Sequence, residues 1–353
     1  MNLDDSNSYS TIDKEKMINE IRDLPAQLQR AWEAGMQKPL PSYTGIERIL
    51  IAGMGGSAIG ADLISAYLSP VCEIPIVVHR NYGLPAWAKG QKTLVILSSH
   101  SGNTEETLSA CRQAIENQCR LAAITTGGKL SELASEHNFP CWKFRHDGQP
   151  RAAVGYSFGM ILAMLTRLNL LPNPEKDLLD AVNQMRMQEK TLLPDVPVSK
   201  NPAKRAAGQW LGRWIAVIGA DFLAPVARRW KGQVNEVAKT WAQFDTLPEV
   251  DHNTLAGVSN AANAVLHTMV VFLTAPACHP RNILRTKLTK KAFMLEALNT
   301  DLYEAQGSSR LAQMWTAIHF GDYVSYYLAI AYQVDPTPIP AIEGFKAELN
   351  QFD

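Results

Sequence analysis

The sequence predicts an α/β protein in which mostly parallel sheets carry helices on both faces, a three-layer α/β/α arrangement repeated in two modules. The chain has 353 residues, which is long for one open-sheet domain and sufficient for two. Short β-branched runs alternate with stretches of helical length in the first half, as parallel strands with crossover helices require. A strand-turn-helix opening recurs in the second half, where IGAD at 59–62 is repeated at 218–221.

The first module is predicted from a helical segment at 14–36 followed by alternating strands and helices. The strands are the β-branched runs at 48–53, 74–79, 93–99 and 121–126. Stretches of helical length lie between them at 58–68 and 104–118. A buried helix at 151–171 and a charged helix that reaches about residue 190 follow, so we expect the first module to span residues 1–190.

A proline-bearing stretch then predicts a linker at 191–204 and a second module at 205–353. In this module we expect a strand at 214–220 that opens directly into a helix through residues 221–239. Two further helices are expected near the C-terminus, at 310–333 and 341–351.

Charge and cysteine content favour a cytoplasmic protein that acts on a small molecule. Lys plus Arg and Asp plus Glu each total 34, so no net basic field attracts a nucleic acid. The five cysteines are scattered without a Cys-x-x-Cys pair, which fits a reducing compartment better than a disulfide framework or a zinc site. The N-terminal residues lack the basic start and apolar run of a signal peptide, and the apolar stretch at 265–275 is too short to cross a membrane.

The first chemistry-bearing segment is the glycine-rich turn in IAGMGGSAIGADL at 51–63, between a strand and a helix. Glycines let the backbone approach a ligand, and the free N–H groups of the helix N-terminus favour an anion. A dinucleotide fingerprint is an alternative, because Gly53, Gly55 and Ala58 satisfy its looser form. Glu73 disfavours it, since this acid precedes the second strand instead of ending it. A tight turn without a ligand is the third interpretation.

The second segment is SSHSGNTEET at 98–107, again at the end of a strand and the start of a helix. Three hydroxyl side chains beside a helix N-terminus could bind a phosphate monoester without a Lys or Arg in the loop; these are Ser99, Ser101 and Thr104. The alternative is ordinary helix capping, because Glu106 follows Asn103 at capping-box spacing. Capping accounts for one of the hydroxyls but not for three.

The third segment, at 228–253, contains an acid, Glu236, and an imidazole, His252, sixteen residues apart. From spacing alone both could be solvated surface residues, and Glu236 could form an i, i+3 pair with Lys239 on a helix. The alternative interpretation is that each is a proton-transfer group.

Five phrases of the chain, in this order, resemble the bifunctional phosphoglucose/phosphomannose isomerase family of the sugar isomerase (SIS) superfamily. The phrases are GMGGSAIG at 53–60, SHSGNTEET at 99–107, RAAVGYSFG at 151–159, RWKGQVNE at 229–236 and LPEVDHN at 247–253. The resemblance implies two SIS domains and a homodimer. It further implies that the protein isomerises glucose 6-phosphate and mannose 6-phosphate to fructose 6-phosphate. The implied reaction passes through a cis-enediol and needs no metal or cofactor.

The same resemblance implies roles for individual residues. Sugar contacts are assigned to Gly55, Gly56 and Ser57, and phosphate contacts to Ser99, Ser101 and Thr104. Glu236 becomes the base, and Arg151 lies near the C1 and C2 oxygens. His252 comes from the partner subunit and assists ring opening, while Lys346 matches a C-terminal lysine near the site.

At two positions, His100 and Thr337, the match to the family is less direct. Many members have Tyr where this chain has His100, which could add a pH-dependent donor at the phosphate loop. The threonine linked in the family to accepting mannose 6-phosphate falls near 335–340, where Thr337 is the candidate.

Three other function classes are weighed against this one. A zinc-dependent phosphomannose isomerase is disfavoured because the eight His residues show no short ligand spacing and no His-Glu pair. A sugar-phosphate sensor without catalysis remains the main alternative, although no helix-turn-helix segment is evident. An NADP-linked reductase would use the turn at Gly53 and Arg80.

Overall fold

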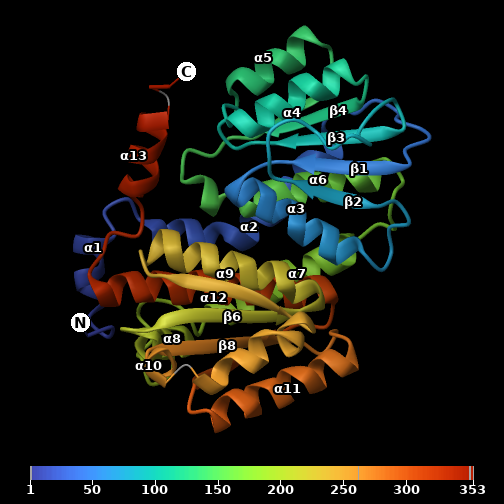
Figure 1. The fold of residues 1–353 in the computed structure, drawn as a ribbon. Coiled ribbons are helices and arrows are strands. Elements are labelled where there is room, and N and C mark those ends of the chain that lie inside the picture. The colour runs from blue at the N-terminus through green and yellow to red at the C-terminus, as the bar shows by residue number, and fades with distance from the viewer. Residues whose placement is uncertain (1, 261, 350, 353) are drawn as a thin grey trace.

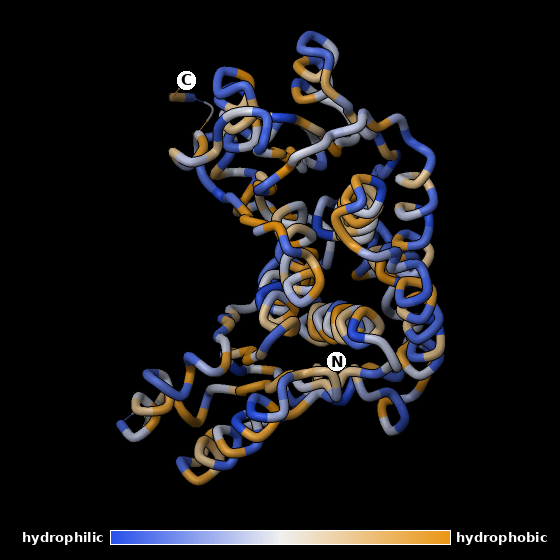
Figure 2. The backbone as a smooth tube through the Cα atoms, turned by 90° about the vertical axis from the view of Figure 1, so that its right-hand side faces the viewer, coloured by the Kyte–Doolittle hydropathy of each residue, from blue (hydrophilic) through white to orange (hydrophobic). Residues whose placement is uncertain are grey.

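The computed structural model describes residues 2–260, 262–349 and 351–352. Within these residues the chain forms two all-parallel sheets that lie one above the other, with helices between them (Figure 1). Seen from the side, the two sheets with their outer helices lie at opposite ends of the molecule (Figure 2). The predicted α/β class with helices on both faces of parallel sheets is therefore confirmed.

Among the described residues the first sheet has five strands in the order β2-β1-β3-β4-β5, and the second has four in the order β7-β6-β8-β9. The strands of the first sheet are β1 (Arg48–Ala52), β2 (Ile76–His79), β3 (Thr93–Ser98), β4 (Arg120–Thr125) and β5 (Cys141–Lys143). Those of the second are β6 (Trp214–Ala220), β7 (Ala242–Leu247), β8 (Thr268–Thr274) and β9 (Asn299–Glu304).

Helices cover both faces of each sheet. In the first half they are α1 (Tyr9–Ile12), α2 (Met17–Gln37), α3 (Gly55–Leu68), α4 (Glu105–Glu116), α5 (Gly128–Glu136), α6 (Val154–Arg167) and α7 (Glu175–Glu189). In the second half they are α8 (Pro202–Trp210), α9 (Ala224–Val237), α10 (Ala262–Leu266), α11 (Pro280–Leu295), α12 (Arg310–Tyr332) and α13 (Pro340–Leu349). Two short 3-10 turns bear on the site, η2 (Pro150–Ala152) and η4 (Glu249–His252).

Side chains of the central strands alternate between two cores, as the period of a β-strand dictates. On β1, Ile49 and Ile51 pack inward with α2, α3 and α6, whereas Leu50 and Ala52 pack outward with α4 and α5. The inward core continues without interruption to the second sheet, where β6 contributes Ile215 on the same side. One apolar core therefore joins the two sheets.

Helix α12 lies in the middle of this core. Every residue from Leu311 to Ala331 is buried, and α2, α7, α8 and α9 all pack against it. In the described part of the chain, no helix combines the length and apolar composition needed to cross a bilayer.

The elements predicted from the sequence are found within a few residues of their expected limits, and four strands were not predicted. The strand predictions at 48–53, 74–79, 93–99, 121–126 and 214–220 correspond to β1, β2, β3, β4 and β6. The strands without a prediction are β5, β7, β8 and β9. β5 is three residues long, and β7 and β9 are only partly buried, so they lack a clear apolar run. β8 lies within the apolar stretch that had been considered only as a membrane span.

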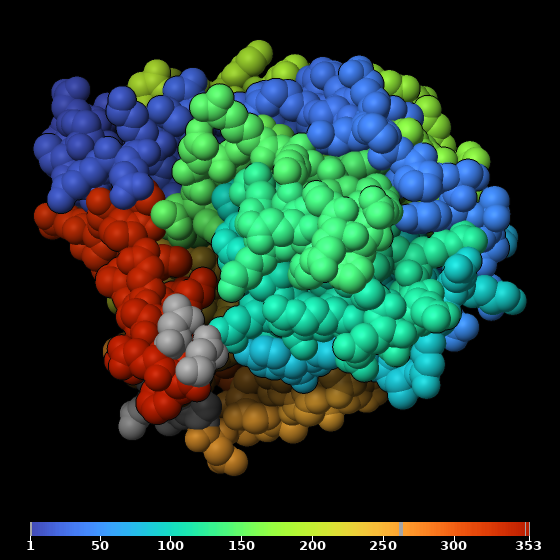
Figure 3. Space-filling view, turned by 90° about the horizontal axis from the view of Figure 1, so that it is seen from above, coloured from blue at the N-terminus to red at the C-terminus, as the bar shows by residue number. Residues whose placement is uncertain are grey.

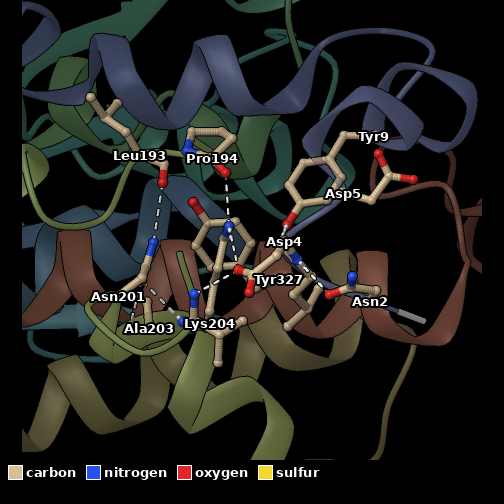
Figure 4. A network of polar contacts seen from close by, with 12 residues as sticks. Asn2, Asp4, Asp5, Tyr9, Leu193, Pro194, Asn201, Ala203, Lys204 and Tyr327 are labelled. Carbon is tan, nitrogen blue, oxygen red and sulfur yellow. Dashed lines mark hydrogen bonds and ion pairs between the residues drawn. The ribbon is translucent and has the colours of Figure 1, made fainter. Parts of the chain in front are cut away.

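The segment between the two halves is fastened by a buried lysine (Figure 4). Lys204, on α8, has a fully buried side chain whose ammonium donates to the Pro194 carbonyl oxygen at 2.7 Å. It lies 5.7 Å from the ring centre of Tyr9 and 5.5 Å from that of Tyr327, and 4.0 Å from an Asp4 carboxylate oxygen. The predicted linker, whose limits remain a prediction, is thus tied to the N-terminus and to α12.

We expect Lys204→Ala to lower the free energy of unfolding by about 2–4 kcal/mol, because it removes a buried charge together with its hydrogen bond and ring contacts. Urea denaturation followed by circular dichroism measures the loss. Lys200→Ala, at an exposed lysine of the same segment, is the matched control and should change little. Equal stability of the two variants would contradict a structural role for Lys204.

Candidate active site

A pocket of about 280 Å³ is lined by residues from both halves of the chain. The start of α3 contributes Gly55, Gly56 and Ile59, and the end of β2 is followed by Arg80. The remaining lining residues are Arg151, Arg228, Arg229, Lys231, Gly232, Gln233, Glu236 and Phe244. Four residues predicted to belong to the site therefore meet in one place: Gly55, Gly56, Arg151 and Glu236.

Helix α9 presents a polar face to this pocket because Arg229, Gln233 and Glu236 follow each other at helical spacing. Asp322 of α12 fixes this face: its carboxylate accepts from Arg229 Nη2 at 2.6 Å and from Gln233 Nε2 at 3.0 Å. Both charged groups of the pair are buried. Burial raises the pKa of Asp322, and the positive charge of Arg229 opposes that shift.

Arg151 is held on the η2 turn opposite α9. Its backbone carbonyl accepts from Arg229 Nη1 at 3.2 Å, and its Nη2 donates to the carbonyl oxygens of Pro336, at 2.9 Å, and Thr337. Its Nη1 lies 3.9 Å from Glu236 Oε2, and the Arg151 side chain is only 3% exposed. Burial lowers the pKa of Arg151 and the Glu236 carboxylate partly offsets this, so the guanidinium stays charged.

The glycine-rich turn approaches Arg151 closely. A Cβ on Gly56 would lie 2.7 Å from the Pro150 carbonyl oxygen, so only glycine fits against the η2 turn. Gly55 adopts a φ of +50°, the left-handed region that glycine favours. Glu73 lies before β2, as the sequence indicated, so the acid expected of a dinucleotide site is absent from the end of this described strand.

The predicted phosphate loop follows β3. Ser99 Oγ and Thr104 Oγ1 are 2.9 Å apart, Ser99 Oγ accepts from Gly102 N at 3.1 Å, and Ser101 Oγ accepts from Asn103 N at 3.2 Å. The N-cap residue of α4 is Thr104, and among the described residues no side chain caps this terminus. Asn103 instead accepts from Lys129 N. The capping-box alternative is therefore wrong, and the N-terminus of α4 is available to an anion.

His252 and Lys346 lie outside the pocket. His252 is exposed at the end of the turn η4, which Arg285 and Thr289 hold through Asp251 at 2.7 and 2.6 Å. Lys346 lies on α13, a helix at one edge of the molecule whose described residues are all exposed (Figure 3). Neither side chain completes the site within one chain.

Thr337 lies beside Arg151 and His100 lies in the phosphate loop, and the contacts of both residues were not predicted from the sequence. Thr337 is buried, and its carbonyl, not its hydroxyl, binds Arg151; its Oγ1 has no hydrogen-bond partner among the described residues. The His100 side chain is hydrogen-bonded to His146 at 3.0 Å.

Other residues near the site were not found by sequence reasoning. Asp62 of α3 binds Arg80 and, at 3.0 Å, Arg228 of α9, which joins the two halves at the pocket. The Glu236–Lys239 pair expected from spacing is replaced by a bond from Lys239 to the Val237 carbonyl. Partial burial and the charge of Arg151 lower the pKa of Lys239 to about 8. Arg80 and Lys239 were visible in the sequence, but nothing there placed them beside Glu236.

In the parts of the chain that the structure describes, no three His, Cys, Asp or Glu side chains gather as a metal site requires.

Comparison with known proteins identifies relatives over nearly the whole chain. Residues 199–349 match a family described as the bacterial phospho-glucose isomerase C-terminal SIS domain. A bifunctional phosphoglucose/phosphomannose isomerase of Caldicellulosiruptor bescii is 38% identical over 339 residues, covering 95% of this chain and 99% of that protein. One from Aquifex aeolicus is 34% identical over 326 residues, covering 92% and 95%. A solved structure of a hypothetical protein from Thermus thermophilus has the same fold, with a TM-score of 0.72, 15% identity, and coverage of 95% of this chain and 90% of that one.

Proposed function

The chain belongs to the bifunctional phosphoglucose/phosphomannose isomerase family, and we propose that it interconverts glucose 6-phosphate and mannose 6-phosphate with fructose 6-phosphate. Membership confirms the resemblance carried by the five sequence phrases. The observation that supports this activity best is the pocket in which Glu236 faces Arg151 at 3.9 Å, beside the glycine-rich turn.

In this proposal Glu236 is the base. Aldose–ketose isomerisation removes a proton from the carbon next to a carbonyl and returns it to the neighbouring carbon, so one carboxylate can perform both transfers across a cis-enediol. Glu236 is the carboxylate that lines the pocket, and its side chain is 30% exposed, so a sugar carbon can reach it. The proton leaves C2 of the aldose, rests on Glu236, and is delivered to C1 of the enediolate, while the proton of the C2 hydroxyl passes to the C1 oxygen; the product is the ketose.

Arg151 stabilises the negative charge that develops on the C1 and C2 oxygens. Its hydrogen bonds to the carbonyls of Pro336 and Thr337 hold the guanidinium in place before substrate binds, so little reorganisation is needed during the reaction. Its Nη1 donates to Gln149 Oε1 at 3.3 Å and lies 3.9 Å from Glu236 Oε2, near which the reacting carbons would lie.

The phosphate group binds at the loop of Ser99, Ser101 and Thr104. Two of these hydroxyls already contact each other, and the N-terminus of α4 adds backbone N–H donors. Gly55, Gly56 and Ser57 contact the sugar between this loop and Glu236. Binding energy from the distant phosphate then positions C1 and C2 for proton transfer.

A second copy of the chain completes the site in this proposal. His252 and Lys346 are both exposed, and α13 carries three apolar side chains on one face that the described residues leave uncovered: Ile342, 39% exposed, Phe345, 64%, and Leu349, 41%. A homodimer would cover this face and bring His252 to the partner's pocket to assist ring opening.

We expect Glu236→Gln to lower kcat by at least about 10²-fold with fructose 6-phosphate, because the amide cannot accept the proton, while KM changes little. A coupled assay for glucose 6-phosphate measures both constants, and mannose 6-phosphate is assayed as second substrate. Glu296→Gln, at an exposed glutamate, is the control. Near-normal turnover by Glu236→Gln would remove this residue from the mechanism, and a wild-type protein that binds the sugar without turnover would instead be a sensor.

Ser101→Ala should act on binding. Loss of one hydrogen bond to a dianion weakens binding by about 1–3 kcal/mol, so we expect KM to rise roughly 5- to 150-fold with kcat nearly unchanged. Ser135→Ala, at an exposed serine of α5, serves for comparison. An unaltered KM would mean that the loop does not bind the phosphate.

The proposed homodimer is tested by measuring the molar mass of the protein in solution. Light scattering after size exclusion should give twice the 39.0 kDa of one chain, and Phe345→Asp should shift the protein toward the monomer because a charge cannot be buried against an apolar partner surface. A monomeric wild-type protein with full activity would exclude a site shared between subunits.

A further inference from the structure

A chain of hydrogen bonds connects α2 to the phosphate loop. Glu20 Oε2 and His146 Nε2 are 2.9 Å apart, and His146 Nδ1 and His100 Nε2 are 3.0 Å apart. Glu20 lies on the first turn of α2, His146 in the segment that leads to the η2 turn, and His100 between the two serines of the phosphate loop. Three segments distant in sequence therefore meet through three side chains.

The chemistry of these groups sets the direction of the bonds. A carboxylate only accepts, so His146 Nε2 carries a hydrogen and donates to Glu20. In neutral His146 the other nitrogen, Nδ1, accepts from His100 Nε2–H. His100 is neutral, because burial and the neighbouring His146 lower its pKa to about 4. The side chain of His100 is thus tied to His146 and serves as an anchor for the loop.

Aromatic packing fixes the two imidazoles from the other sides. The His100 ring lies 5.7 Å from the ring of Phe144, and the His146 ring lies 5.9 Å from that of Tyr156, both measured between ring centres. Gly148 permits the approach of Glu20, since a Cβ there would lie 2.8 Å from Glu20 Oε1. Glu20 and Tyr156 are the other titratable groups that face the imidazole pair.

Helix α2 holds the other half of the site from the same face. Gln27 follows Glu20 by seven residues, two turns further along the helix. Its Nε2 donates to the carbonyl of Ala152, the residue directly after Arg151, at 2.9 Å. Its Oε1 accepts from Gly155 N at 2.8 Å. One helix face therefore fixes both the phosphate loop, through the imidazoles, and the turn that carries Arg151.

We propose that Glu20, His146 and His100 are positioning residues that hold the phosphate loop at a fixed distance from Arg151, so that a phosphorylated sugar can contact both at once. This rests on the function proposed above. The three side chains touch neither the phosphate nor the reacting carbons, and they act through the backbone of residues 99–104. Their loss should weaken binding of the phosphate end and leave the proton transfer at Glu236 nearly intact.

The test compares Glu20→Leu and His146→Leu with the wild type. For both we expect KM for fructose 6-phosphate to rise about tenfold with kcat within about threefold, and binding of inorganic phosphate, measured by calorimetry, to weaken by a similar factor. Glu20→Gln keeps an acceptor oxygen for His146 and should recover most of the affinity. His137→Leu, at an exposed histidine, is the matched control.

Unchanged KM and phosphate affinity in both leucine variants would overturn the proposal, and so would a loss confined to kcat. Should His146→Leu fail to fold, comparison of Glu20→Leu with Glu20→Gln still tests the proposal. Glu20 is partly exposed, so its replacement removes no core side chain. If the wild-type protein does not turn over fructose 6-phosphate, the proposed isomerase activity fails. The calorimetric comparison with inorganic phosphate then still judges the positioning role.

Discussion

The buried ion pair between Arg229 and Asp322 is the interaction on which the site depends. Asp322 belongs to the central helix α12, and through Arg229 and Gln233 it sets the rotation of α9 and hence the direction of Glu236. Arg229 also donates to the Arg151 carbonyl, so the same pair fixes the opposite wall. A buried pair of this kind contributes little net stability, but removing one partner would strand a charge in the core. Its role here is to fix the positions of Glu236 and Arg151 relative to each other.

Charges in the pocket are held in place before any ligand arrives. Arg229 is neutralised by Asp322, and Asp62 binds both Arg80 and Arg228. Arg151 donates hydrogen bonds to backbone carbonyls and faces the Glu236 carboxylate at 3.9 Å. Fixed charges beside a partly enclosed space stabilise developing negative charge more effectively than mobile ones, because they do not have to reorient during the reaction.

The parallel sheets and the glycine and serine turns could be predicted from the sequence because those features are local: apolar runs, glycines and helix starts follow one another along the chain. Glu236 and Arg151 were also assigned to one site, although only through resemblance to a family. The anchors could not be read in the same way. Glu20 and His100 are 80 positions apart, and their connection through His146 exists only once α2 packs beside the first sheet. The edge strands β7 and β9 were missed because half-buried strands lack a distinct apolar pattern.

Burial of α12 on all sides has a consequence for biosynthesis. This helix follows α2, α7 and α9 along the chain, yet all three pack against it, so segments made earlier must wait for one made later. A ribosome-bound chain that lacks this helix leaves the apolar faces of α2, α7, α8 and α9 without their packing partner. The apolar faces of these earlier helices therefore stay uncovered until α12 has been made, and the interior can close only after that.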